Sequence, residues 1–383
     1  MSLPIRFQTE AGTAPVVSVD GAFGAPGLHL SHWPGNTTPP GLKRDLSTGI
    51  ALEYARLPLA ERAALAAGCE AIAVNHYDTD GLCALFAVLE PELALQHEPL
   101  LMAAAESGDR FRTPDLAGFR LDAVFLALAD PSRSPLPADV FALRGAAKHS
   151  RLVDEGLRAL RRVLAAGLEV YRALWEPAER ALEADRRDLA AALFDDLVHL
   201  DLAVWTAPFG RGSTRSSAAG GPSAVGALNA ADDGPGRVFD PGRHALFGAT
   251  RADRVLALGP GPLGTTARLI IGTGSFFDLA TEVGSPRPEL AELVTRLQAL
   301  EDRRGPRDAQ TRWQTQAQSG ASPELWYGRS GLPLYGEHAG PWLAPSQLSA
   351  EDIKATVLDA VRATWPVPDD DDVAAPDEDI FAV

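Results

Sequence analysis

The sequence has few residues of the kinds that several large classes of protein need. It contains two cysteines, Cys69 and Cys83, which form no CxxC pair and are too few for a disulfide framework. Its longest clear apolar run, Ala123–Ala129, has seven residues, well short of the roughly 18 that a membrane span requires. The N-terminus lacks the basic and then apolar pattern of a signal peptide. We therefore expect a reduced, cytoplasmic protein that is not inserted into a membrane.

Positive charge is scarce as well. The 35 Lys and Arg residues oppose 51 Asp and Glu residues and leave a net charge of -16. Long nucleic acids and anionic membranes bind positive surfaces, so we expect neither as a partner. The chain also lacks the motifs GxxxxGKS/T, HExxH and GxSxG, which are signatures of P-loop proteins, zinc proteases and serine hydrolases. Gly259–Gly264 fits the pattern GxGxxG, but its prolines remove amide donors that a dinucleotide site needs.

Composition divides the chain into four parts. Residues 209–236 are rich in glycine, serine and alanine, which predicts a flexible linker or loop. Residues 366–383 hold seven acidic residues and no basic one, which predicts a disordered acidic tail. We therefore expect an N-terminal domain over residues 1–208 and a smaller C-terminal domain over residues 237–365.

Short apolar runs alternate with helical patterns in the N-terminal part, which is typical of an α/β fold with a largely parallel sheet. The predicted strands are Val16–Val19, Ala71–Val74 and Ala123–Ala129. The last of these is continuously apolar, as a strand buried on both faces should be. The predicted helices run from an N-cap at Asp45 to about Leu57, from Leu82 to about Glu90, and over most of Ala138–Val204.

The C-terminal part predicts a smaller α+β domain. Arg254–Leu258 and Ala267–Ile271 have the pattern of two strands joined by a turn of glycine and proline. A helix from Pro288 to about Arg303 follows, and Trp326–His338 has the composition of an irregular aromatic segment.

Acidic residues follow the three predicted strands of the N-terminal part. Asp20 and Asp130 end their strands, and Asp78 lies just beyond its strand. Ligands of an open parallel sheet bind outside the carboxyl ends of its strands, so we expect these acids to converge on one crevice. Asp before Gly or Pro is also ordinary turn chemistry, which stays an alternative for Asp20 and Asp130.

The middle segment has the most specific pattern. His76, Asp78 and Asp80 are spaced i, i+2, i+4, which in an extended chain directs all three side chains to one side. Imidazole with carboxylates suits Mn²⁺, Mg²⁺, Fe²⁺ or Zn²⁺, and carboxylate-rich sites favour the harder ions. A carboxylate between two cations can hold them roughly 3.5–4 Å apart, as phosphoester displacement requires. The alternative is that Asp80 caps the following helix and that Asp78 is solvated.

The segment VNHYDTDGLCA, Val74–Ala84, places HxDxDG between a predicted strand and a predicted helix. It resembles the first motif of the DHH phosphoesterase superfamily, which includes RecJ-type exonucleases, oligoribonucleases and family II pyrophosphatases. The resemblance implies a two-domain α/β protein whose dinuclear Mn²⁺ or Mg²⁺ site hydrolyses phosphoester or phosphoanhydride bonds with a metal-activated water. It also implies that His76, Asp78 and Asp80 are metal ligands and that Asp130 matches the second motif.

No Asp-His-His tripeptide occurs in the chain. Two other functions therefore stay open: a diverged DHH-like domain that binds a ligand or partner, and a metalloenzyme with non-phosphate chemistry. The chain as a whole is also similar to actinobacterial proteins, a likeness that implies no function.

Several further residues are candidates. His32 follows the first predicted strand in a Gly/Pro-rich loop and is our preferred extra ligand or acid, with Asp109 as a weaker catalytic candidate because SGD is good turn chemistry. Asp195 and His199 would share a helix face, although a solvated or capping role fits them better. Arg329 and His338 could contact a phosphate or a base.

We thus predict a metal-dependent hydrolase of a small phosphorylated substrate, a phosphoester or nucleotide, with Mn²⁺ or alternatively Mg²⁺ as cofactor. The metal ligands would be His76, Asp78, Asp80, Asp130 and Asp20. The catalytic residues would be His32 and Asp109, and the substrate contacts would be Arg329 and His338.

Overall fold

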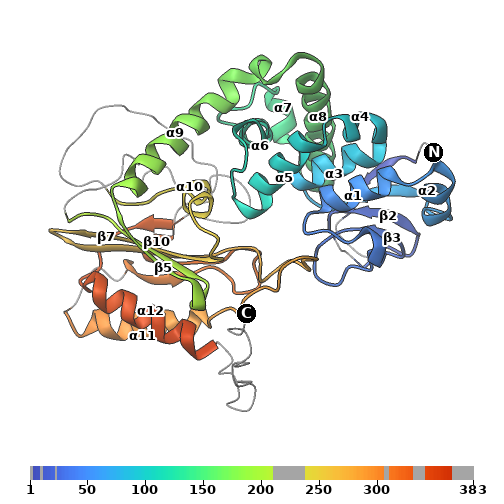
Figure 1. Ribbon diagram of the computed structural model, residues 1–383. Helices are drawn as coiled ribbons and strands as arrows, with labels where there is room; N and C mark the ends of the chain where they lie inside the picture. The colour runs from blue at the N-terminus through green and yellow to red at the C-terminus, as the bar shows by residue number, and fades with distance from the viewer. Residues whose placement is uncertain are drawn as a thin grey trace, which may run out of the picture.

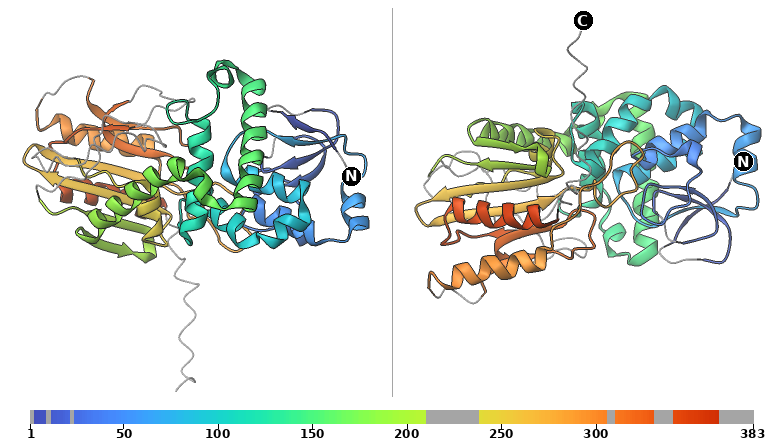
Figure 2. Two further views of the ribbon diagram at one scale, coloured as in Figure 1. Left: turned by 90° about the horizontal axis from the view of Figure 1, so that it is seen from above. Right: turned by 60° about the horizontal axis from the view of Figure 1, so that its bottom comes forward.

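The computed structural model of the chain describes residues 3–8, 12–21, 24–209, 238–305, 310–330 and 341–364. Nearly all of the predicted linker, the predicted acidic tail and His338 lie outside these ranges. In the described part, two β-sheets lie at opposite ends of the molecule and helices pack on and between them (Figure 1, Figure 2).

The first sheet is small and entirely parallel. Its strands are β1 (Ile5–Phe7), β2 (Val16–Val19), β3 (Gly27–Leu30) and β4 (Ala71–Val74). They lie in the order β1-β4-β2-β3. The predicted strands Val16–Val19 and Ala71–Val74 are confirmed. Because all four strands run in one direction, the segments that follow β2, β3 and β4 meet at one edge of the sheet.

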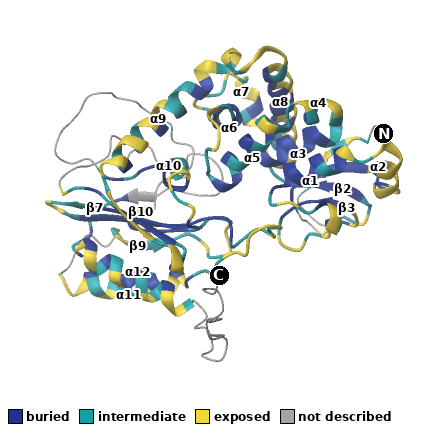
Figure 3. Ribbon diagram, in the orientation of Figure 1, coloured by how far each residue is buried: buried dark blue, intermediate teal, exposed yellow. Residues whose placement is uncertain are grey.

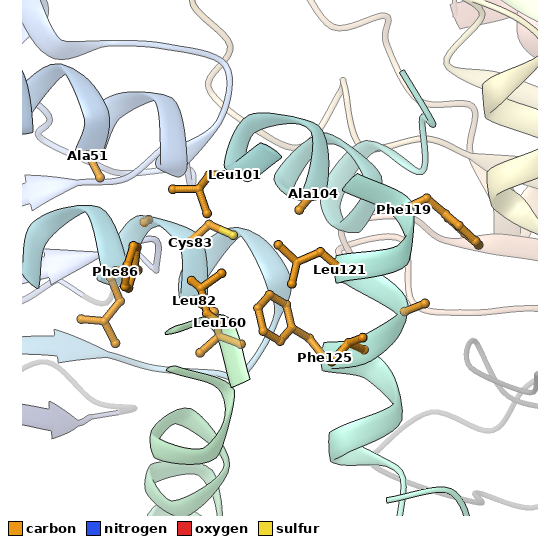
Figure 4. Packing of buried hydrophobic residues seen from close by; sticks show 14 of the residues in the cluster. Ala51, Leu82, Cys83, Phe86, Leu101, Ala104, Phe119, Leu121, Phe125 and Leu160 are labelled. Carbon is orange, nitrogen blue, oxygen red and sulfur yellow. The ribbon is translucent and has the colours of Figure 1, made fainter. Parts of the chain in front are cut away.

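Helices connect and cover these strands. They are α1 (Ser47–Arg56), α2 (Leu59–Leu65), α3 (Thr79–Leu89), α4 (Pro91–Gln96), α5 (Glu98–Arg110), α6 (Leu116–Ala129), α7 (Ala138–Ala142) and α8 (Gly145–Ala166), with a 3-10 turn η1 at Pro40–Leu42. Figure 4 shows how Phe86 of α3, Leu101 of α5 and Phe125 of α6 enter one apolar cluster. Burying each such side chain contributes about 1.5–3 kcal/mol.

The prediction of a strand over Ala123–Ala129 is wrong, because these residues form the second half of α6. Asp115 begins the helix, since its side chain accepts a hydrogen bond from the amide of Ala117. The helix is packed against neighbours on most of its surface, with Leu121, Val124 and Phe125 fully buried. A short run that is apolar on all sides does not distinguish a buried helix from a buried strand.

The predicted N-cap at Asp45 is also wrong. Helix α1 begins at Ser47 after an extended Leu46, and no side chain caps it in the usual way. The carboxylate of Asp45 instead accepts hydrogen bonds from the amides of Ala280 and Thr281. The acid that we predicted as a helix cap therefore makes a tertiary contact with residues more than 200 positions away.

The second sheet has seven strands in the described part of the chain, and it is mostly antiparallel. Its strands are β5 (Leu193–Leu197), β6 (Leu202–Thr206), β7 (Arg254–Gly261), β8 (Gly264–Ile271), β9 (Arg312–Thr315), β10 (Glu324–Ser330) and β11 (Pro341–Leu343). The order is β11-β10-β8-β7-β6-β5, with β9 also paired to β10 and with β6 and β7 parallel.

The predicted hairpin is confirmed as β7 and β8, but three other expectations need correction. The first part of the predicted irregular segment is strand β10, in which Trp326 and Tyr327 are buried. The predicted helix up to Val204 ends at Ala190, so that Asp195 lies on a strand and His199 on the 3-10 turn η3 (Val198–Leu200). Since β5 and β6 belong to the second sheet, that sheet begins before the predicted boundary at residue 208.

Helices cover both faces of the second sheet (Figure 1, Figure 3). They are α11 (Leu290–Asp302) and α12 (Ala350–Thr364) on one face, and α9 (Arg172–Ala190) and α10 (Arg243–Gly248) on the other, with a 3-10 turn η2 at Leu168–Tyr171 before α9. Leu256 and Leu258 join one apolar cluster, whereas Val255 and Ala257 join the other. This is the alternation that a strand between two layers requires.

The architecture is therefore α/β at the N-terminal end and α+β at the C-terminal end, as the sequence predicts. None of the described helices combines the length and the apolar character that crossing a bilayer requires.

Candidate metal centre

Asp20 lies immediately after β2 and is 1% exposed. Its φ of 65° is in the left-handed region, which Asp tolerates better than most residues. Its amide donates to the carbonyl of Leu30, which joins it to the end of β3. The turn is tight, because a Cβ on the next residue, Gly21, would lie 2.0 Å from the Asn75 side chain. The backbone thus fixes Asp20 at the carboxyl edge of the sheet.

His32 reaches the same edge from the end of β3. Its Nδ1 lies 2.7 Å from the carbonyl oxygen of Asp45, to which it donates, and its side chain is fully buried. A histidine whose Nδ1 is held in this way presents Nε2 to its other neighbours, an arrangement common among metal-binding histidines.

The segment after β4 brings two carboxylates and a second histidine. Asp78 is the N-cap of α3 and accepts from the amide of Gly81 at 2.8 Å. Asp80, in the first turn of that helix, is 0% exposed. Its two oxygens accept from the amides of Ser47 and Thr48, each at 2.8 Å. The alternative in which Asp80 is the cap is therefore wrong: Asp78 caps α3, and Asp80 binds the free amides at the start of α1.

These residues form two groups that could each hold a cation, and their potential ligand atoms lie within 4.8 Å of one another in each group. We call Asp20, His32, Asp80 and Asp109 the buried group, and Asp20, His76 and Asp78 the outer group. Asp20 belongs to both.

The buried group is centred on His32. Its Nε2 lies 3.1 Å from Asp109 Oδ2, 3.5 Å from Asp20 Oδ1 and 3.6 Å from Asp80 Oδ2. Asp109 comes from the last turn of α5 and not from the turn that its SGD sequence predicts. The four side chains therefore reach one point from four separate segments of the chain.

The outer group is centred on His76. Its Nε2 lies 2.8 Å from Asp78 Oδ2 and 2.9 Å from Asp20 Oδ2, and its Nδ1 faces the side-chain oxygen of Asn75. The side chains of His76 and Asp78 are 29% and 32% exposed, so this group is open to solvent. The ring of Trp33 borders it, with its centre 5.0 Å from that of His76.

Polar atoms at the centre of the two groups lack hydrogen-bond partners of normal geometry. These buried atoms are both carboxylate oxygens of Asp20, Nε2 of His32 and Oδ2 of Asp109. The 2.9 Å contact of Asp20 Oδ2 with His76 is close, but it does not have the geometry of a hydrogen bond. Leaving such an atom buried and unpaired costs about 1–3 kcal/mol. A cation would make all four atoms ligands, so the residues present fit a metal.

Charges in the buried group shift the pKa values of its members. Burial lowers the pKa of His32, but Asp109, Asp20 and Asp80 outweigh it and raise that pKa well above its usual value. Burial and the charge of Asp20 raise the pKa of Asp80 to about 6. Burial and the charge of Asp80 raise the pKa of Asp109 as well. Without a cation, the group is therefore stabilised by protons, and a cation must compete with them.

The outer group has a different balance. Burial raises the pKa of Asp20, but His76 and His32 outweigh it and bring that pKa far below its usual value. Burial lowers the pKa of His76, but Asp78 and Asp20 outweigh it and raise that pKa well above its usual value. Asp20 is thus the carboxylate that keeps its negative charge between two imidazole rings.

Residues 272–285, which we call the strap, run from β8 toward α11 across the edge of the first sheet (Figure 1, gold). The ring of Phe277 stacks on that of His32 at 3.8 Å between centres. The amide of Asp278 donates to the His32 carbonyl at 2.7 Å, and the Asp278 carboxylate accepts from Asn36 and Lys43. The strap thus covers the buried group on the side of His32.

Asp45 connects the strap to this group through its carboxylate and its backbone carbonyl. Its carboxylate accepts from the amides of Ala280 and Thr281 and from the Thr281 hydroxyl, while its carbonyl accepts from His32. At the base of the strap, Asp253 accepts from the amides of Gly274 and Ser275. The strap is therefore held at both of its ends.

Of the nine predicted site residues, the structure brings six together and leaves two apart. Asp20, His32, His76, Asp78, Asp80 and Asp109 converge. Asp130 is the C-cap of α6, and its carboxylate accepts from the amide and hydroxyl of Ser132. Its predicted place at the end of a strand is therefore wrong. Arg329 is exposed on β10 of the second sheet, and His338 lies outside the described residues.

Sequence patterns missed two parts of the centre. Asp122, a buried acid on α6, accepts from the Thr79 hydroxyl at 2.6 Å. Its signal in the sequence is a single acid within the apolar stretch Leu121–Ala129. The strap gave no local signal, because its contacts with His32 and Asp45 join residues more than 200 positions apart.

Fold and site define an α/β protein with a buried cluster of Asp20, His32, Asp80 and Asp109 that could hold a metal ion. A family model described as "Family of unknown function (DUF6687)" matches residues 4–372, so the chain belongs to this family. No curated protein and no solved structure matches the chain significantly.

Proposed function

We propose that the protein is a metal-dependent hydrolase of small phosphoesters or nucleotides, with Mn²⁺ or Mg²⁺ on the two sides of Asp20. The observation that supports this most is the shared carboxylate. Asp20 Oδ1 faces His32 Nε2 in the buried group, and Asp20 Oδ2 faces His76 Nε2 in the outer group. A carboxylate shared in this way suits a pair of cations about 3.5–4 Å apart.

The donor set favours hard divalent cations. Across both groups it consists of four carboxylates and two imidazoles, with no thiolate, a combination that suits Mn²⁺ or Mg²⁺ better than soft ions. When bound, such cations lower the pKa of water toward neutrality and offset phosphoryl charge.

The protein's own groups hold these donors in place. Asp45 accepts the Nδ1 proton of His32, and the amides of Ser47 and Thr48 bind the Asp80 carboxylate. Because backbone atoms fix the side chains of His32 and Asp80, these two ligands need little reorganisation when a cation binds. The DHH tripeptide is absent. In this proposal His32 and Asp109, for which the sequence predicts catalytic roles, are instead ligands in the buried group.

The substrate approaches from the outer group. His76 and Asp78 are partly exposed, whereas the strap and Phe277 cover His32. Trp33 and Phe276 pack edge-on beside the outer group, and such a partly covered site suits a small molecule better than a long polymer. The net charge of -16 favours the same conclusion, and a cytoplasmic location is part of the proposal.

The test is hydrolysis by protein that has been treated with EDTA and then loaded with Mn²⁺ or Mg²⁺. The substrates are aryl phosphodiesters, nucleotides, cyclic nucleotides and pyrophosphate. We expect metal-dependent turnover that Asp78→Asn abolishes, since Asn retains the helix cap but not the carboxylate. The matched control is Glu301→Gln, a buried acid of the second sheet's helix α11, which should keep turnover. Turnover that persists in Asp78→Asn would contradict the proposal.

A second candidate is a ligand-binding protein that retains the cations without hydrolysis. The covering of His32 by Phe277, at 3.8 Å, favours it, because a closed centre protects a cation without requiring turnover. Cation binding without hydrolysis of any of these substrates would support this second candidate over the first.

A further inference from the structure

One buried acid near the centre belongs to neither cation group. Asp122 is 1% exposed in the middle of α6, a helix that is otherwise almost entirely apolar. A carboxylate in such surroundings is costly unless its oxygens are bound by donors. Two hydroxyl groups from different segments donate to it, and a histidine ring from a third segment contacts it.

The first donor is Thr79, which lies between the ligand candidates Asp78 and Asp80. Its hydroxyl donates to Asp122 Oδ1 at 2.6 Å, the shorter of the two hydroxyl contacts that Asp122 makes. Thr79 is also the first residue of α3. Fixing its side chain therefore fixes the turn from which the two carboxylates diverge, one toward each cation group.

The second donor is Ser107, two residues before Asp109 on α5. Its hydroxyl donates to Asp122 Oδ2 at 3.3 Å. The two helices touch here, since a Cβ on Gly108 would lie 2.8 Å from the Cβ of Thr79. Asp122 thus connects α3 and α5 at the point where both present ligands to the buried group.

The third contact comes from the second sheet's side of the molecule. His244, on α10, has its Nε2 3.3 Å from Asp122 Oδ2 and 3.0 Å from the Ser107 carbonyl oxygen. The rings of Phe111 and Phe119 pack edge-on against it. The Nε2 of His244 donates to the Ser107 carbonyl oxygen and so holds Ser107 from a second direction.

We propose that Asp122 is a positioning residue of the cation centre, which sets the separation between the carboxylates of α3 and the carboxylate of α5. This inference rests on the proposed function, because it assumes that the two groups bind cations. Groups that orient metal ligands through hydrogen bonds typically change metal affinity 10- to 100-fold when they are removed.

The experiment measures Mn²⁺ affinity by isothermal titration calorimetry on the full chain, together with the Mn²⁺ electron paramagnetic resonance spectrum. We expect Asp122→Ala to weaken binding about 10- to 100-fold and to change the spectrum. Asp122→Asn should restore most of the affinity, since its side-chain oxygen still accepts from Thr79.

Glu301→Ala is the matched control for stability. Glu301 is 2% exposed and accepts from Ser346 and Gln347 on the far side of the second sheet. Both Ala variants should lower the melting temperature in EDTA, but only Asp122→Ala should weaken Mn²⁺ binding. Equal affinity of Asp122→Ala and wild type, or equal weakening by both variants, would overturn the inference.

Thr79→Val keeps the test decisive if Asp122→Ala does not fold. It removes the hydroxyl and preserves the shape of the side chain, and we expect it to weaken Mn²⁺ binding in the same direction. Its matched control is Thr356→Val on α12, which removes another buried hydroxyl and should leave Mn²⁺ binding unchanged.

The two proposals fail in different ways. Wild-type protein that binds no Mn²⁺ would overturn the proposed function and this inference together. Wild-type protein that binds Mn²⁺ while Asp122→Ala and Thr79→Val bind it equally well would overturn the inference alone.

Discussion

The buried group and the outer group share Asp20 and differ in how their other donors are held. In the buried group, backbone atoms of three residues hold His32 and Asp80. In the outer group, a single backbone amide, that of Gly81, holds Asp78, and His76 and Asp78 both remain partly exposed. The same types of donor therefore lie in two environments, one closed and rigid and the other open to water.

This difference predicts that the buried group retains its cation and that the outer group leaves its cation accessible. A buried carboxylate whose pKa is raised gains more from a cation than an exposed one, because solvent does not screen the interaction. We therefore expect the buried group to hold its cation tightly and exchange it slowly. The outer group should exchange quickly and should meet the substrate.

Removal of the shared carboxylate should have the largest effect. Asp20→Asn changes a ligand of both groups, so both Mn²⁺ affinities should fall by at least about 100-fold, more than the loss of an orienting group causes. Calorimetric titration of Mn²⁺ into EDTA-treated protein measures both. Retention of either site at wild-type affinity would contradict the role of Asp20 in that group.

A pair of variants should separate the two groups. Asp80→Asn should remove the slowly exchanging Mn²⁺, and Asp78→Asn should remove only the rapidly exchanging one and retain the cap of α3. The number of Mn²⁺ ions that remain after gel filtration, measured by elemental analysis, distinguishes them. The comparison fails if the two variants lose the same ion.

The dependence on pH should follow the buried group. His32, Asp80 and Asp109 have raised pKa values, so the metal-free folded protein binds more protons than the unfolded chain. Its stability therefore falls as pH rises through these pKa values, and for Asp80 the window runs from 3.8 to about 6.

Cation binding has the opposite dependence, because it displaces these protons. Mn²⁺ affinity should therefore rise between about pH 5 and pH 7, by up to tenfold per pH unit for each proton displaced. The increase in melting temperature that Mn²⁺ causes should grow over the same range. Scanning fluorimetry with and without Mn²⁺ measures this. A shift that is independent of pH would show that these groups do not bind the cation.

Loosening the strap should have the smallest effect. Asp45→Asn retains the carbonyl that holds His32 but weakens the contact with Thr281, at a cost of about 1 kcal/mol. We expect EDTA to remove the slowly exchanging Mn²⁺ about fivefold faster, with no change for the outer ion. Asp352→Asn on α12 serves as the control, and equal rates in Asp45→Asn and wild type would contradict a covering role for the strap.

The sequence predicted those parts of the site that depend on local pattern. Strands β2 and β4 are short apolar runs between turn residues, and His76, Asp78 and Asp80 follow the second of them in a recognisable motif. His32, a candidate from the loop after the first predicted strand, lies beside Asp20 in the structure.

What the sequence did not predict depends on tertiary packing. The apolar run at Ala123–Ala129 is a helix because other helices surround it, and that is invisible in one short stretch of sequence. The sequence around Asp109 is typical of a turn, but Asp109 lies on α5. The small Gly108 lets this helix pack closely against Thr79, a tertiary contact that the local sequence does not reveal. Contacts between distant segments, such as Phe277 on His32, leave no local pattern.

The most direct test of the shared role of Asp20 is anomalous diffraction at the manganese edge from crystals grown with Mn²⁺. We predict two anomalous peaks, one on each side of the Asp20 carboxylate, with His32, Asp80 and Asp109 around one and His76 and Asp78 around the other. No peak at these groups, or a single peak that Asp20 does not contact, would contradict this account.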